Sequence, residues 1–183
     1  MIFEEYLKNV YEFDTPPFPY TRKKLRAGHI ITDYQEIERK MYFLEKGLVE
    51  ETVLEDDKES IVAFFCENSF VTSFASLLKQ IPSDKRITTI EECEITVIQR
   101  DDLFNAYERC LKASRLGRIE SDKAYLQRVR REKLLITKSA AERYQLILEE
   151  ESEIIRRVPN YKIAAYLGIT PESLSRIRRR IIS

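Results

Sequence analysis

The sequence predicts an α+β protein whose first half forms strands and whose second half forms helices. Short β-branched and aromatic segments, bounded by turn residues, recur between about residues 20 and 100. Residues 101–136 contain no proline and are rich in Leu, Arg, Lys, Glu and Ala, which favours helix. Further amphipathic segments with capping signals follow in the remaining residues.

Composition limits the classes of protein that fit this sequence. Charged residues make up 34% and hydrophobic residues 43%, as in folded proteins that bury a core. The longest apolar run, residues 61–66, is far shorter than the roughly 18–20 residues that a bilayer-spanning helix needs, so we expect no membrane association. The N-terminus carries two glutamates and lacks the basic and apolar regions of a secretory signal, so we expect a cytoplasmic protein.

The 31 basic and 31 acidic residues balance, but they are unevenly distributed. Residues 156–183 hold seven basic side chains and one acidic side chain, a net charge of +6, so residues 1–155 carry −6. A basic segment on an acidic body suggests a polyanionic partner such as nucleic acid. A solvated charged face is the alternative, and charge alone does not separate the two.

Neither a metal site nor a catalytic site is expected from the sequence. The three cysteines, Cys66, Cys93 and Cys110, lie far apart, and His29 is the only histidine, so the ligand spacing of zinc and iron–sulfur sites is missing. The thiols are expected to pack as reduced, small apolar groups. Without a Gly-rich phosphate loop or a nucleophile elbow, we predict that the chain is not an enzyme and needs no cofactor.

The elements of the first half follow from local patterns. Residues 1–13 predict an amphipathic helix, which the proline-rich residues 14–19 end. Its apolar side is expected to hold Ile2, Phe3, Tyr6, Leu7 and Val10. Strands are expected at residues 25–32 with a turn at Gly28, at 41–44 and 48–53 around a turn at Gly47, at 61–66 and at 95–98. Residues 73–79 favour a short helix.

Residues 101–136 are predicted to form a long helix with an apolar stripe. The stripe consists of Leu116, Ile119, Leu126 and Val129. Lys123 and Lys133 interrupt its heptad positions. A coiled-coil-like dimer helix is the favoured interpretation, and a helix packed on its own domain is the alternative.

A capping box, Ser-Ala-Ala-Glu at residues 139–142, is predicted to start the next helix, which runs to about Glu151. Its inward-facing side chains are expected to be Tyr144, Ile147 and Leu148. Residues 158–160, Val-Pro-Asn, then end this segment and start another helix.

Residues 160–179 predict two helices joined by a tight turn. Ala164 is small where two helices would cross closely, and Gly168 tolerates the positive φ needed just past the end of the first helix. Thr170 can cap the second helix, and Pro171 suits its first position. The buried positions of the pair are expected to be Ile163, Leu167, Ile169, Leu174, Ile177 and Ile181.

The second of these helices has the residue types of a DNA major-groove reader. Its outer side is expected to hold Glu172, Ser173, Arg176 and Arg180. Arginine can bond bidentately to guanine, and glutamate can accept from the cytosine amino group. Phosphate contacts are expected from Thr170, Arg178 and Arg179. Ordinary packing of two amphipathic helices without DNA is the alternative.

This segment resembles the C-terminal domain of the Crp/Fnr family of bacterial transcription regulators. The resemblance rests on Ser-Ala-Ala-Glu-Arg-Tyr at 139–144, Arg-Val-Pro at 157–159 and IAAYLGITPESLSRIR at 163–178. In that family the residues matching Glu172 and Arg176 read bases. Residues 42–49, YFLEKGLV, extend the resemblance to the first half, where it implies a jelly-roll-like antiparallel β-roll that acts as a sensor.

The resemblance implies three units along the chain. Residues 1–100 would form the cyclic-nucleotide-binding-like sensor, 101–138 the dimerisation helix and hinge, and 139–183 the helix-turn-helix DNA-binding domain. Such a protein would be a homodimeric regulator of double-stranded DNA, acting on a near-palindromic site with its two recognition helices about 34 Å apart.

The sensor departs from the pattern of the family's cyclic-nucleotide binders. Those proteins carry Gly-Glu-Leu where this chain has Thr-Ser-Phe at residues 72–74, and an Arg-Ser or Arg-Thr pair where it has Pro82-Ser83. Arg86 lies nearby but out of register. Because a cyclic phosphate would lose a charged hydrogen bond of about 1.5–3 kcal/mol, we predict no response to cyclic AMP.

The position of an effector and the overall role therefore remain hypotheses. Thr72, Ser73 and Ser83 are the candidate pocket for an unknown small-molecule effector. The alternative function is a β-roll that binds a protein or a non-nucleotide ligand and carries a weakened DNA reader. The end of the sequence at Ser183, directly after the second helix, would remove any wing that contacts the DNA backbone.

Overall fold

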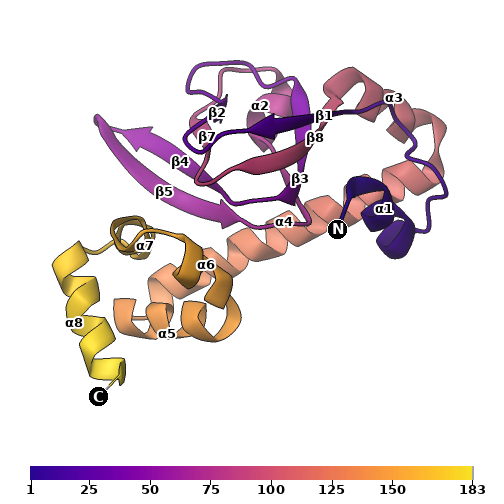
Figure 1. Ribbon diagram of the computed structural model, residues 1–183. Helices are drawn as coiled ribbons and strands as arrows, with labels where there is room; N and C mark the ends of the chain where they lie inside the picture. The colour runs from indigo at the N-terminus through magenta and orange to yellow at the C-terminus, as the bar shows by residue number, and fades with distance from the viewer. Residues whose placement is uncertain (183) are drawn as a thin grey trace.

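The computed structural model describes residues 1–182, which form a roll of two four-stranded antiparallel sheets with helices before and after it (Figure 1). The strands are β1 (Thr21–Leu25), β2 (Ile30–Thr32), β3 (Lys40–Lys46), β4 (Val49–Glu55), β5 (Lys58–Phe65), β6 (Ser69–Val71), β7 (Lys85–Thr89) and β8 (Cys93–Gln99). One sheet has the order β1-β8-β3-β6 and the other has the order β2-β7-β4-β5. The predicted α+β class is confirmed.

Helices precede and follow the roll, and one short helix lies between β6 and β7. The helices are α1 (Phe3–Tyr11), α2 (Phe74–Lys79), α3 (Arg100–Arg109), α4 (Leu111–Thr137), α5 (Ala140–Glu150), α6 (Ser152–Arg157), α7 (Asn160–Leu167) and α8 (Pro171–Ile182). Figure 1 shows α4 running along the roll, from α3 at one end to the last four helices at the other. Of the helices within residues 1–182, none has the length and apolar character needed to cross a membrane.

The turn at Gly47 carries the chain from one sheet to the other. The predicted strands on both sides of it are present, but β3 pairs with β6 and β8, whereas β4 pairs with β5 and β7. Gly47 has φ +106°, and a Cβ added there would lie 2.5 Å from Cys93 Sγ. A local pattern identified the turn, whereas the pairing of its strands depends on contacts distant in sequence.

Two strands, β6 and β7, were not predicted from the sequence, and of β1 only Leu25 lies within a predicted strand. β6 has three residues, and β7 has five residues with the sequence KRITT. β6 is too short to form a pattern, and the burial of the β7 side chains alternates from Arg86 to Thr89, so neither strand is marked by an apolar run.

Helix α1 confirms the predicted N-terminal helix and packs through an aromatic cluster. Its predicted face is correct at Phe3, Tyr6 and Leu7, which are buried. The prediction is wrong for Ile2 and Val10, which are exposed. Tyr11 is buried instead, because its hydroxyl reaches Glu120 on α4 and its ring packs against Tyr6.

The single helix predicted for residues 101–136 is instead two helices, separated at Cys110. This residue has extended backbone angles, φ −131° and ψ 107°, and α3 folds back onto α4. Leu116 is buried and Ile119 packs against the same core, so the first half of the stripe faces the chain's own domain. Leu126 is 64% exposed, and Val129 is also exposed.

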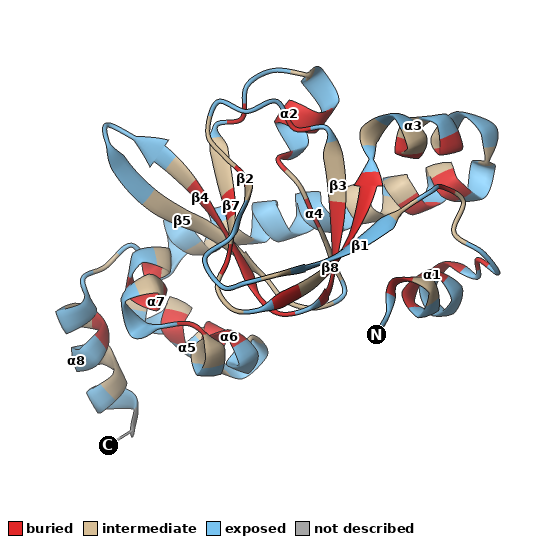
Figure 2. Ribbon diagram, turned by 45° about the horizontal axis from the view of Figure 1, so that its top comes forward, coloured by how far each residue is buried: buried red, intermediate tan, exposed pale blue. Residues whose placement is uncertain are grey.

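Three of the last four helices, α5, α7 and α8, begin as predicted, whereas α6 was not predicted; all four share a core with the roll. Ser139 and Glu142 form the capping box, and Tyr144 and Ile147 are buried, with Leu148 partly buried. Buried side chains from these helices form one cluster with the roll residue Leu48, against which Phe64, Cys66 and Ile90 also pack. Figure 2 shows these buried positions on α5, α6 and α7, and exposed positions along much of α4 and α8.

We predict that Gly47→Ala destabilises the protein much more than Gly28→Ala. Both glycines have positive φ, but an added Cβ at Gly28 meets no atom within 4 Å, whereas at Gly47 it would also lie 2.8 Å from the Glu92 carbonyl oxygen. Urea unfolding should show a loss of about 1–2 kcal/mol for Gly28→Ala and about 3–5 kcal/mol for Gly47→Ala. Equal losses would contradict the close approach of Gly47 to β8.

Candidate nucleic-acid interface

Helices α7 and α8 are joined by a three-residue connection with the predicted geometry. Gly168 is left-handed, with φ +70°, and the amide of Ile169 donates to the Ala164 carbonyl at 3.0 Å. Ala164 is fully buried. The Thr170 hydroxyl accepts from the Ser173 amide at 3.3 Å, so it caps the start of α8.

Apolar side chains hold the two helices together. Ile163, Leu167 and Leu174 are each 1% exposed, and Ile169 and Ile177 are partly buried against the same cluster. The prediction that Ile181 is buried is wrong: it is 39% exposed. Ile181 lies in the last turn of α8, one turn beyond Ile177, and this turn extends past the apolar cluster.

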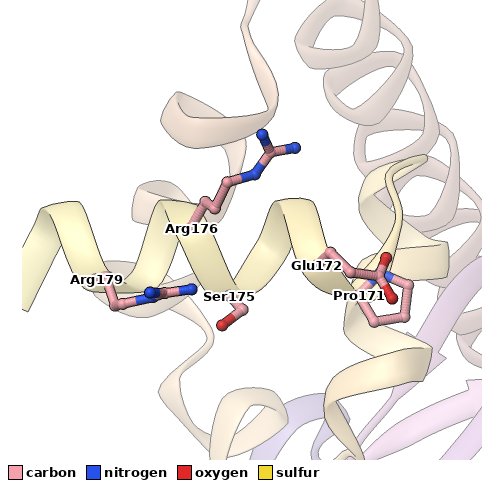
Figure 3. Close-up of a pocket in the computed structure, with 5 residues that line it drawn as sticks. All are labelled: Pro171, Glu172, Ser175, Arg176 and Arg179. Atoms are coloured by element: carbon pink, nitrogen blue, oxygen red, sulfur yellow. The ribbon is translucent and has the colours of Figure 1, made fainter.

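One face of α8 forms a shallow depression open to solvent (Figure 3). Its lining residues are Pro171, Glu172, Ser175, Arg176 and Arg179. Glu172, Arg176 and Arg179 were predicted site residues, whereas Ser175 was missed. Ser175 and Arg176 follow Glu172 by three and four residues, which places all three on one face of the helix. This helical spacing is the sequence signal by which Ser175 could have been predicted.

The remaining predicted site residues lie around this depression. Arg180 is exposed on α8 but is not among its lining residues. Ser173 is half-buried, and its hydroxyl accepts from Arg176 Nη2 at 3.1 Å, which orients that guanidinium. Arg178 Nη1 donates to Asn160 Oδ1 at 2.6 Å, so it links α8 to the start of α7.

Glu172 is a carboxylate placed among positive groups. Its own backbone amide, the Thr170 hydroxyl and the charge of Arg176 together hold its pKa below the ordinary value. It therefore remains ionised at neutral pH and accepts hydrogen bonds only. The depression thus offers one strong acceptor beside the guanidinium donors of Arg176 and Arg179.

Two of the three candidate effector residues, Ser73 and Ser83, meet at the start of α2. Ser73 and Ser83 are 0% and 1% exposed, and their hydroxyl oxygens lie 2.7 Å apart. Ser83 Oγ also accepts from the Lys85 amide at 3.1 Å. Thr72 is turned elsewhere, because its hydroxyl donates to the Lys40 carbonyl at 2.9 Å.

An ion pair beside these serines was not found from the sequence. Side chains alternate along β7, and Ile87 is buried in the core, so Lys85 points into the roll and Arg86 points outward. Lys85 Nζ lies 2.5 Å from Glu51 Oε1, and the two side chains are 18% and 7% exposed. Arg86 instead pairs with Asp33 on the outer side, at 2.6 Å.

The three cysteines are free thiols, each packed in a different apolar cluster. Cys93 is fully buried, and burial raises its pKa to about 11. Burial also raises the pKa of the Cys66 thiol. Protonated, buried thiols act as small apolar side chains, in agreement with the role expected for them.

Comparison with protein families identifies the roll. Residues 22–110 match the family described as the cyclic nucleotide-binding domain, a region that extends from β1 through α3. Comparison with curated protein sequences gave no match.

Solved structures match most of the chain. FixK2 from Bradyrhizobium japonicum is 22% identical, with a TM-score of 0.75 over 89% of this chain and 84% of that protein. A Crp/Fnr-family protein from Eubacterium rectale is 15% identical, with a TM-score of 0.77 over 97% and 88%. The regulator CLP from Xanthomonas campestris, described as responsive to c-di-GMP, is 18% identical, with a TM-score of 0.71 over 88% and 86%. The chain therefore has a fold shared with Crp/Fnr transcription regulators and contains a domain of the cyclic nucleotide-binding type.

Proposed function

We propose that this protein is a transcription regulator that binds double-stranded DNA as a homodimer, at a near-palindromic site in the cytoplasm. The observation that carries the proposal is the exposed face of α8, where Glu172, Ser175, Arg176 and Arg179 lie together. The turn at Gly168 and the buried Ala164 support the assignment of α7 and α8 as a helix-turn-helix motif. The net charge of +6 over residues 156–183 supports a polyanionic partner.

In this proposal α8 is the recognition helix. Arg176, oriented by Ser173, donates to guanine O6 and N7, and the Glu172 carboxylate accepts from a cytosine amino group. Arg179 and Arg180 contact phosphates at the edges of the groove. Thr170 and Arg178 are also assigned to phosphates, and both have structural contacts that fix their positions.

The proposed dimer forms through α4. Its exposed apolar residues Leu126, Val129 and Ile136 follow the spacing of a heptad stripe, with Lys133 between the last two. Ile136 is 76% exposed, which is unusual for an isoleucine on a helix without a partner. We assign residues 101–138 to this dimerisation unit, residues 1–100 to the sensor and residues 139–183 to DNA binding. Helix α3, at the start of the dimerisation unit, also contacts β8 of the sensor.

The sensor is proposed not to respond to cyclic AMP. Pro82 stands where cyclic-nucleotide binders have an arginine, Lys85 is paired with Glu51, and Ser73 and Ser83 are buried against each other. A cyclic phosphate would have to break these pairs before Lys85 could bind it, and the cost of breaking them opposes its binding. The serines and the Lys85–Glu51 pair are the place where an unidentified effector of other chemistry would act.

The DNA proposal is tested by selection from random duplexes. We expect enrichment of a two-fold-symmetric motif. Arg176→Ala should relax the base preference at one position in each half-site and reduce the binding free energy by about 1–3 kcal/mol. Arg156→Ala is the control, since Arg156 is an exposed arginine of α6 paired with Glu153. Binding without sequence preference would contradict the proposal, and uniform weakening by Arg176→Ala would assign this residue to phosphate.

The effector proposal is tested by calorimetric titration of the purified protein with cyclic AMP. We expect no heat of binding, because the Lys85 charge is already neutralised inside the roll. Micromolar binding would overturn this part of the proposal and would indicate that the Lys85–Glu51 pair opens for a cyclic phosphate.

A further inference from the structure

The C-terminal helices are attached to the roll by a charged contact centred on Arg157, the last residue of α6. Its Nη1 and Nη2 donate to the Glu67 carboxylate at 2.9 and 2.7 Å, and Nη2 also donates to Glu91 Oε1 at 2.5 Å. Glu67 Oε1 in turn accepts from the Gly47 amide at 2.8 Å. The β3–β4, β5–β6 and β7–β8 turns therefore meet at one guanidinium group.

The charges of this contact are strongly coupled. Hydrogen bonding to Arg157 holds the pKa of Glu67 at about 2, and the two carboxylates raise the pKa of Arg157. Arg157 is 20% exposed, so its charge is partly removed from water while it makes a two-pronged contact with Glu67. Such bidentate geometry fixes direction as well as distance, which a single lysine contact does not.

A second row of contacts continues along α7. Lys162 pairs with the buried carboxylate of Glu50 on β4. The Tyr166 ring packs against Phe64 of β5, with ring centroids 5.0 Å apart. Arg131 of α4 also lies 3.7 Å from the Tyr166 ring centroid and donates to the Tyr166 carbonyl at 3.0 Å.

These contacts come from α4, α6 and α7 and leave the recognition face open. Glu172, Ser175 and Arg176 on α8 are exposed, and Figure 1 shows α7 between the β4–β5 hairpin and α8. The contacts therefore connect α6 and α7 to the roll and to α4 without covering the residues of α8 that would reach DNA.

We propose that Arg157, Glu67 and Glu91 form an interdomain clamp that presets the orientation of the recognition helix. This inference rests on the proposed function. In a dimer joined through α4, a fixed orientation would set the separation of the two recognition helices before DNA is bound. When the first half-site is bound, the second recognition helix is then already in position, and no further conformational ordering of the protein is needed. This raises the effective concentration of the second helix at its half-site.

The clamp itself is tested without DNA, by hydrogen–deuterium exchange of the full chain. In Arg157→Gln, amides of residues 152–167 and of the turn at residues 66–68 should exchange faster than in the unaltered protein. Arg156→Gln is the matched control, because the side chain of this neighbouring arginine pairs within residues 1–182 with Glu153 of its own helix. Equal exchange in both variants would overturn the clamp. The double variant Glu67→Gln/Glu91→Gln should reproduce the effect with the arginine still present.

The orientation role is tested with the DNA site found by selection. Arg157→Gln should weaken binding to the full palindromic site by about tenfold or more, with little change at an isolated half-site. Equal weakening at both sites, or tighter binding to the full site, would overturn the presetting role. If the unaltered protein shows no sequence-specific DNA binding, the proposed function fails, while the exchange measurement still decides whether the clamp exists.

Discussion

The backbone amide of Gly47 donates to the Glu67 carboxylate, and in the proposed clamp this bond positions the group that binds Arg157 and so attaches the C-terminal helices. Gly47 is at the point where the chain passes from one sheet to the other, close against Cys93. With one carboxylate oxygen held by the backbone of the roll, Glu67 presents both oxygens to Arg157. Leu48, the next residue, belongs to an apolar cluster that also attaches the helices α5, α6, α7 and α8 to the roll. Gly47 and Leu48 thus serve the passage between the two sheets, the attachment of the helices and the packing of the core.

Features that depend on neighbouring residues were predictable from the sequence. The capping box at Ser139 and Glu142 and the left-handed Gly168 are examples, because the atoms that form each contact lie within a few residues. The break at Cys110 was not predictable in this way, since α3 turns back to pack on α4 and no proline or glycine marks the site. The exposure of Ile181 likewise reflects where the neighbouring helices end.

The same division applies to the candidate sites. Helical spacing alone placed Glu172, Arg176 and Arg179 on α8, and it also identifies Ser175 once the shared face is known. The Lys85–Glu51 pair depends on the register of β4 against β7, which brings Glu51 opposite Ile87. A one-residue change in that register would turn Glu51 outward, so a sequence pattern within either strand does not reveal the pair.

The stacking of Arg131 on Tyr166 has a mechanical consequence for the proposed dimer. Arg131 follows Val129 by two residues, which places it about 200° around α4, on the side opposite the dimer stripe. In the proposed dimer, α4 would therefore pack against α4 of the second subunit on one side and against α7 on the other. Any rotation of α4 about its long axis would move both contacts together. A change in how the two subunits pair would therefore also change the orientation of α8.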